Sequence, residues 1–190
     1  MEKSFDCRVN ELKLKKLKSS FQIWTCMIAN GEVTSTEFTN ILGDYRHQVS
    51  PLKEIIKSVF GFQDKHTLPA LGLALTERAP KRAVQQYIEK GYQLRDEIEK
   101  ILGEDGVLLF PSFPCVAPYH NQPFFTNTLD YLYFGIINSL GFPSTQCPMG
   151  LSKEGLPTGI QIIAGHKMDH LTIRLAEYFE SNLVGWIPPF

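Results

Sequence analysis

The sequence has no long apolar run, no signal-like start and almost no net charge. Its longest apolar stretches have the length of strands and fall short of the roughly 20 residues that a membrane-spanning helix needs. The first six residues lack the apolar segment of a signal peptide, so secretion is not indicated and an intracellular location is expected. The formal net charge of -1 gives no general attraction for nucleic acid, and no nucleic-acid partner is expected.

Paired cysteines and paired glycines are missing as well. The four cysteines are Cys7, Cys26, Cys115 and Cys147. They form no CxxC pair, which excludes a zinc ribbon and gives no sign of a disulfide framework, so reduced, buried thiols are expected. None of the fourteen glycines is adjacent to another, and the only Ser-Ser pair is Ser19-Ser20, inside a lysine-rich segment. The sequence therefore shows no glycine- and serine-rich loop of the kind that presents backbone amides to an oxyanion.

The remaining composition is that of a globular protein. At 190 residues and 43% hydrophobic content the chain is long enough to bury a core. No repeat, linker or low-complexity segment divides it. We predict one structural piece over residues 1–184 and a terminal tail over residues 185–190.

Three short apolar runs bounded by glycine or proline are typical of buried strands. They are Val107 to Phe110, Ser144 to Cys147 and Gly159 to Ala164. Because both faces of such runs are apolar, we predict an α/β fold with a mixed β-sheet layered between α-helices. The second and third runs are spaced as a hairpin or as neighbouring strands.

Helical patterns fill most of the rest. The expected helices cover about Leu14 to Ile28, Pro51 to Gly61, Pro80 to Leu102, Leu129 to Leu140, and a final helix that starts near Asp169 as its N-cap. Asn127 or Thr128 is expected to cap the fourth, and Gly103 to end the third. The lysine-rich first helix fits either a membrane surface or a packed helix with a solvated outer face, and we expect the packed helix.

Three linked motifs carry a family resemblance. The motifs are Asp105 to Ser112, Gly141 to Pro148 and Gly155 to Gln161. They occur in the order found in the C-terminal part of amidase signature enzymes, which the chain resembles. Among these enzymes, it resembles the type that hydrolyses fatty-acid amides. The resemblance implies the C-terminal part of the amidase signature fold. It covers only about the last third of a complete family member.

The resemblance also implies a chemistry. A serine nucleophile, a second serine on a cis peptide bond and a lysine base would transfer the acyl group of an apolar acyl amide to serine and then to water, without a metal or organic cofactor. No residue here matches those catalytic positions, so we assign none and predict that this chain alone is inactive. Membrane association is expected only through a region preceding Met1, and assembly into a homo-oligomer is compatible with the sequence.

Substrate-binding candidates lie near the ends of the predicted strands. The proline-rich loop after the first strand carries Phe113, Phe124 and Phe125, which could form an apolar substrate wall or simply cover the end of the sheet. Thr145 and Gln146 place polar groups in a strand, and we also assign them to substrate binding. For Gln146 and for Gln161 the alternative is that the amide braces the scaffold, which we favour, because a buried amide needs hydrogen-bond partners.

Two other pairs are weaker candidates for chemistry. Cys115 and His120 share the proline-rich loop but fit packing better than a thiol nucleophile. His166 and His170 have the four-residue spacing of a metal site but lack the glutamate of an HExxH motif, and a solvated helix entrance is expected there. The alternative to an enzyme is a non-catalytic remnant that acts in lipid binding or as a partner-binding module.

Overall fold

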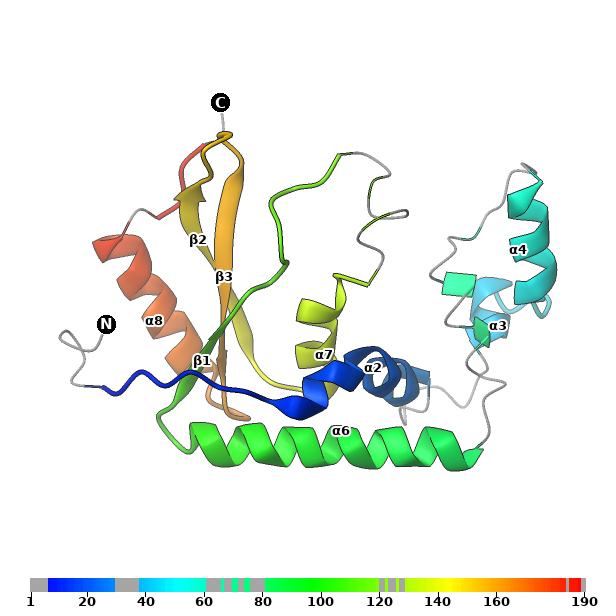
Figure 1. Cartoon of the computed structure of the whole chain (residues 1–190), viewed down its shortest axis with the longest axis horizontal. Coiled ribbons are helices and arrows are strands. Elements are labelled where there is room, and N and C mark those ends of the chain that lie inside the picture. The colour runs from blue at the N-terminus through cyan, green and yellow to red at the C-terminus, as the bar shows by residue number, and fades with distance from the viewer. Residues whose placement is uncertain are drawn as a thin grey trace.

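The computed structural model describes residues 7–29, 38–60, 66, 70–71, 74–75, 81–119, 122, 126, 129–183 and 185–188. Their elements are, in order, η1 (Lys15–Ser19), α2 (Ser20–Ala29), α3 (Phe38–Leu42), α4 (Pro51–Val59), α6 (Lys81–Leu102), β1 (Val107–Phe110), α7 (Leu132–Leu140), β2 (Ser144–Leu151), β3 (Pro157–Ala164) and α8 (Asp169–Asn182). The predicted α/β class is confirmed, and Figure 1 shows the strands beside the helices.

The three strands form one sheet in the order β1-β3-β2, and both pairings are antiparallel. β2 and β3 form a hairpin, one of the two predicted arrangements, and Ser152 closes it, because its hydroxyl accepts hydrogen bonds from the N–H groups of Glu154 and Leu156. Both strands are longer than predicted. Among the described strands β2 pairs only with β3, so Pro148 can lie in it without removing a ladder hydrogen bond. Parallel pairing, which a mixed sheet requires, stays a prediction.

Helices cover both faces of this sheet, and each face has its own apolar cluster. Ile163 belongs to a cluster with residues of α2, α6 and α7, whereas Ile162 packs with Leu175 and Phe179 of α8. Figure 1 shows α8 on one side of the strands and α7 on the other. Adjacent residues of β3 serve different clusters because successive side chains of a strand point to opposite faces.

The lysine-rich N-terminal segment is packed, as expected, but with a different buried face. The spacing of Leu14, Leu17, Phe21, Trp24 and Ile28 predicts that these five share one apolar stripe. Ile23, outside that stripe, is fully buried, whereas Phe21 and Ile28 are exposed. The reason is that residues 15–19 form a 3-10 helix before the α-helix begins, and a turn of three residues shifts the stripe predicted for one continuous helix. α2 crosses α6 where Gly91 leaves room for Ile23 and Met27.

The glycines predicted the C-terminal ends of the helices correctly, whereas the predicted N-caps were less accurate. α6 and α7 end before Gly103 and Gly141, both with positive φ, as predicted. Two starts were wrong. α7 begins at Leu132 with Tyr131 as N-cap, so it starts later than expected, and Asn127 and Thr128 lie outside the described residues. Asp169 is the first helical residue of α8 and Met168 is its N-cap, although a carboxylate in the first turn still favours the helix dipole.

Candidate functional site

Two glutamines face each other across the hairpin. Gln146 of β2 and Gln161 of β3 are register partners, so their side chains lie on the same face of the sheet. Gln161 is only 4% exposed. Its Nε2 donates to the carbonyl oxygens of Pro111 and Tyr133, each at 3.0 Å, and its Oε1 accepts the Ser144 hydroxyl at 3.2 Å. The amide therefore has a partner for each N–H, and the prediction that Gln161 braces the scaffold is confirmed.

Gln146 completes the arrangement from the exposed side. Its Oε1 accepts a hydrogen bond from the Ser112 hydroxyl. The two glutamines thus hold consecutive residues, Pro111 and Ser112, at the point where the chain leaves β1 for the proline-rich loop. We call these four residues the glutamine clamp. A Cβ on Gly159 would overlap the Gln146 amide and lie 2.9 Å from the carbonyl oxygen of Cys147, so only glycine allows this close approach.

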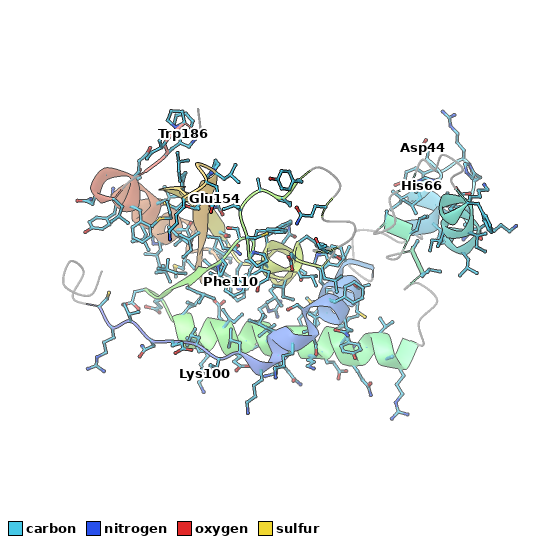
Figure 2. The ribbon with its side chains drawn as sticks, turned by 45° about the horizontal axis from the view of Figure 1, so that its top comes forward. Asp44, His66, Lys100, Phe110, Glu154 and Trp186 are labelled. Atoms are coloured by element: carbon cyan, nitrogen blue, oxygen red, sulfur yellow. The ribbon has the colours of Figure 1, made fainter. Side chains whose placement is uncertain are left out.

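The loop that the clamp holds begins with a predicted substrate residue. Phe113 follows Ser112 directly and is half-buried. Just before the clamp, Phe110, labelled in Figure 2, stacks on Tyr133 with 5.7 Å between ring centroids. The start of the loop is thus held by an aromatic contact and by two glutamine amides. Phe124 and Phe125 lie outside the described residues, and substrate binding by Phe113 stays a prediction.

Thr145 does not share the face of Gln146. Its hydroxyl donates to Thr172 of α8 at 2.7 Å, and the Thr172 hydroxyl donates to the Asp169 carbonyl at 2.8 Å. Because Thr145 and Gln146 are adjacent in a strand, their side chains point to opposite faces of the sheet. A ligand confined to one face of the sheet would meet only one of the two side chains. The substrate assignment of each stays a prediction, but only Gln146 lies beside the proline-rich loop.

A pocket of about 190 Å³ lies between β2, α8 and the chain after α8. Its lining residues are Thr145, Gln146, Cys147, Pro148, Ile173, Ala176, Glu177, Glu180, Gly185 and Trp186. Burial raises the pKa of the Cys147 thiol, and the Glu180 carboxylate adds to the increase. A protonated, buried thiol is a poor nucleophile, so Cys147 is structural. Cys7 and Cys115 are exposed, so the expectation of buried thiols is wrong for these two, and His120, the suggested partner of Cys115, lies outside the described residues.

The histidine pair is split by the fold. His166 precedes α8, and its ring joins two other elements: Nδ1 lies 2.8 Å from Glu99 Oε2 of α6, and Nε2 lies 3.2 Å from the carbonyl oxygen of Leu140 at the end of α7. The solvated entrance expected here is instead a connection between helices. Among the residues that the structure describes, no cluster of three or more His, Cys, Asp or Glu side chains could hold a metal ion.

The hydrogen-bond partners of the described serines determine whether one of them could act as an activated nucleophile. Ser112 and Ser144 donate to glutamine amides, which cannot accept a proton as a general base would. Lys90 Nζ lies 2.7 Å from Ser19 Oγ, which is within proton-transfer distance. Beside Ser19, however, the N–H and the hydroxyl of Ser20 both donate to the carbonyl oxygen of Leu17 in η1. These two donors are therefore used within the helical backbone and do not form an oxyanion hole. The clamp positions a loop and supplies no activated nucleophile.

Motifs, fold and comparisons with known proteins agree on the class of protein. Residues 3–173 match the protein family described as Amidase, and the chain belongs to that family. It is 42% identical to human fatty-acid amide hydrolase 2 over 195 aligned residues, which cover 100% of this chain and 36% of that protein. The chain thus spans little more than a third of the length of the curated relative it matches.

Solved structures support the fold. A crystal structure of an amidase superposes with a TM-score of 0.63 at 16% identity, covering 96% of this chain and 39% of that one. The crystal structure of a glutamyl-tRNA(Gln) amidotransferase chain from Thermotoga maritima superposes with a TM-score of 0.58 at 20% identity, covering 90% of this chain and 34% of that one. Both likenesses show the fold alone.

Sequence reasoning found Gln146 and His166 but missed a partner of each. Ser112 lies 34 residues from Gln146, and Glu99 lies 67 residues from His166. The position of Ser112 just after a predicted strand was the only available signal for it. Nothing in the local pattern around Glu99 distinguishes it from the other charged residues of α6.

Proposed function

We propose that this chain is the C-terminal part of a serine amidase that hydrolyses fatty-acid amides to a fatty acid and an amine. The observation that carries the proposal is the 42% identity to human fatty-acid amide hydrolase 2, which extends over the whole chain. The amidase fold supports it. The clamp supports it further, because a stiff, anchored loop with half-buried Phe113 could form part of the wall of an apolar acyl site.

The chemical step would be supplied by residues of a longer protein. Hydrolysis of an amide requires a nucleophile, a base and fixed oxyanion donors. The resemblance implies a serine, a second serine on a cis peptide bond and a lysine, held in a glycine- and serine-rich segment. The 190-residue sequence contains no adjacent glycines, and its Ser19-Ser20 pair lies at the η1–α2 junction. This chain then contributes scaffold and substrate wall, and the other segment contributes the reacting groups.

The test compares two proteins on a long-chain acyl p-nitroanilide. We expect no hydrolysis by the purified 190-residue chain, and hydrolysis by a longer protein in which an in-frame upstream segment adds the lysine and the glycine- and serine-rich loop. Ser19→Ala and Lys90→Met should leave the activity of the longer protein unchanged, since that pair has no oxyanion donors beside it. Hydrolysis by the short chain that disappears in these variants would refute the proposal. A coding region without such a segment would instead favour the non-catalytic alternative.

A further inference from the structure

One wall of the pocket beside β2 is formed by a face of α8. Figure 1 shows α8 beside β2, which forms the opposite wall through residues 145–148. The lining side chains of α8 are spaced so that they share one side of the helix: Ile173, Ala176, Glu177 and Glu180. Leu175 and Phe179 of the same helix pack on the sheet. Like the other helices in the described part of the chain, α8 is not long and apolar enough to cross a membrane.

The chain after α8 closes a third side of the pocket. Gly185 has a positive φ of 63°, and a Cβ there would lie 3.4 Å from the carbonyl oxygen of Glu180, so the chain stays close to the end of the helix. Trp186 follows and is 67% exposed, and Figure 2 shows it at the outer surface. Its indole makes no ring contact with any described residue. An aromatic ring at the pocket is thus available to a ligand.

The charged groups that line the pocket are all negative. Its two carboxylates belong to Glu177 and Glu180, and none of the lining residues is basic. Glu177 has a weak, solvent-screened contact with Arg174 at 3.5 Å, whereas Glu180 forms no ion pair with any described residue. The Glu180 carboxylate also contributes to the raised pKa of the Cys147 thiol, so its charge acts on the pocket wall. The pocket therefore attracts positive charge.

Size and apolar surface limit what kind of cation fits. The volume of about 190 Å³ corresponds to about six groups the size of a water molecule. Much of the wall beside the carboxylates is apolar, with Cys147, Pro148 and Ala176 among its residues. An inorganic cation would gain nothing from that surface. A small organic cation with an alkyl part would use both the carboxylates and the apolar wall.

We propose that this pocket binds a small alkylammonium ion, whose charged group lies at the carboxylates of Glu177 and Glu180. These two side chains are three residues apart on one helix face, so one ligand can reach both. Hydrogen bonds from the ammonium group to the carboxylates are charge-assisted, and the Trp186 ring adds a cation–π attraction. The alkyl part contacts the apolar wall. The proposal does not rest on hydrolysis of an amide by a longer protein.

The experiment titrates the 190-residue chain with isopentylammonium chloride in a calorimeter. We expect saturable binding with a dissociation constant of about 1 mM, because so small a ligand makes few contacts. Isopentanol has nearly the same shape without the charge and should bind at least about tenfold more weakly, because it cannot form the charge-assisted hydrogen bonds. Added salt should weaken binding of the ammonium ion and leave binding of the alcohol unchanged.

Variants test each part of the site. Glu180→Gln keeps the size of the side chain and should weaken binding by about tenfold, because the unpaired charge is lost. Glu104→Gln is the matched control, since it removes the same charge from an exposed position outside the pocket, and its affinity should equal that of the wild type. Trp186→Leu should weaken binding by about threefold. This variant should also abolish the change in tryptophan emission on binding, since Trp24, the other tryptophan, packs against Tyr131.

Four results would each overturn the proposal. The first is an absence of saturable binding up to roughly 10 mM. The second is equal affinity for isopentanol, which would make the pocket merely apolar. The third is a loss in Glu104→Gln as large as that in Glu180→Gln, with circular dichroism showing that both variants are folded. The fourth is tighter binding of N-acetyl-lysine amide than of isopentylammonium, which would make the pocket a site for a lysine side chain of another protein.

Discussion

Replacing Gln161 by Met should show how much the glutamine clamp contributes to stability. The side chain keeps its length and loses its amide, so Pro111, Tyr133 and Ser144 each lose a hydrogen-bond partner. At a net value of about 1 kcal/mol for each bond, the loss is about 3 kcal/mol. Part of it is offset because the buried amide no longer has to be desolvated. We expect the free energy of unfolding to fall by about 2 kcal/mol.

Two further variants make this prediction specific. Gln146→Met removes one hydrogen bond at an exposed position, so the free energy of unfolding should fall by less than about 1 kcal/mol. Gln161→Glu should be more destabilising than Gln161→Met at neutral pH, because a carboxylate would face the carbonyl oxygens of Pro111 and Tyr133 without a proton to donate.

The measurements are urea unfolding followed by circular dichroism, and hydrogen exchange of residues 107–119. A loss of about 2 kcal/mol corresponds to a fall in Tm of roughly 4–8 °C for a chain of this size. The amides of β1, which pairs with β3, should exchange faster in Gln161→Met while those of α8 stay unchanged. The reasoning fails if Gln161→Met unfolds like the wild type, or if Gln146→Met is the more damaging substitution.

Three other predictions test separate parts of the fold. Gly91→Ala should lower the free energy of unfolding, measured by urea unfolding, by about 1 kcal/mol, because the alanine Cβ would lie 2.9 Å from Ile23. This loss outweighs the better helix propensity of alanine. A more stable variant would contradict the tight α2–α6 crossing. In a double-mutant cycle, His166→Ala and Glu99→Ala should show a coupling of about 1 kcal/mol, limited by the partial exposure of both side chains. Additive effects would mean that the contact contributes nothing. The pKa of the Cys147 thiol is raised above its ordinary 9.0 by burial and then by Glu180, so the folded state binds this proton more tightly than the unfolded state. The contribution of this proton to stability should be present below pH 9 and decline as the pH rises beyond 9, so the loss of stability above pH 9 should be smaller in Cys147→Ala. Native Cys147 should also react with a disulfide reagent far more slowly than exposed Cys115.

Local patterns in the sequence were enough for the elements of the core. Gly106 and Pro111 bound β1 and the 22-residue α6 ended at the predicted glycine, whereas β2 continues through Pro148 and β3 through Gly159. These features depend on φ preferences and on apolar periodicity within a few residues, which a sequence shows directly. The motif order identified the amidase family for the same reason, since it is a property of the chain and not of its folding.

The candidate site could be predicted only in part. A buried glutamine needs partners, and that rule singled out Gln161. It could not say that these partners would be Pro111, 50 residues away, and Tyr133, 28 residues away. Thr145 and Gln146 were grouped because both are polar, although alternation along β2 sends one to α8 and the other to the proline-rich loop.

The sequence by itself determined the family, the helix and strand types, and which residues carry apolar faces. Only the tertiary structure decided which of those faces are covered: Ile23 of α2 is buried against α6 and α7, whereas Leu52 and Ile56 of α4 are exposed. The physical reason is that amphipathicity is a local property of a helix, but burial depends on segments that are distant in the chain and meet only when it folds.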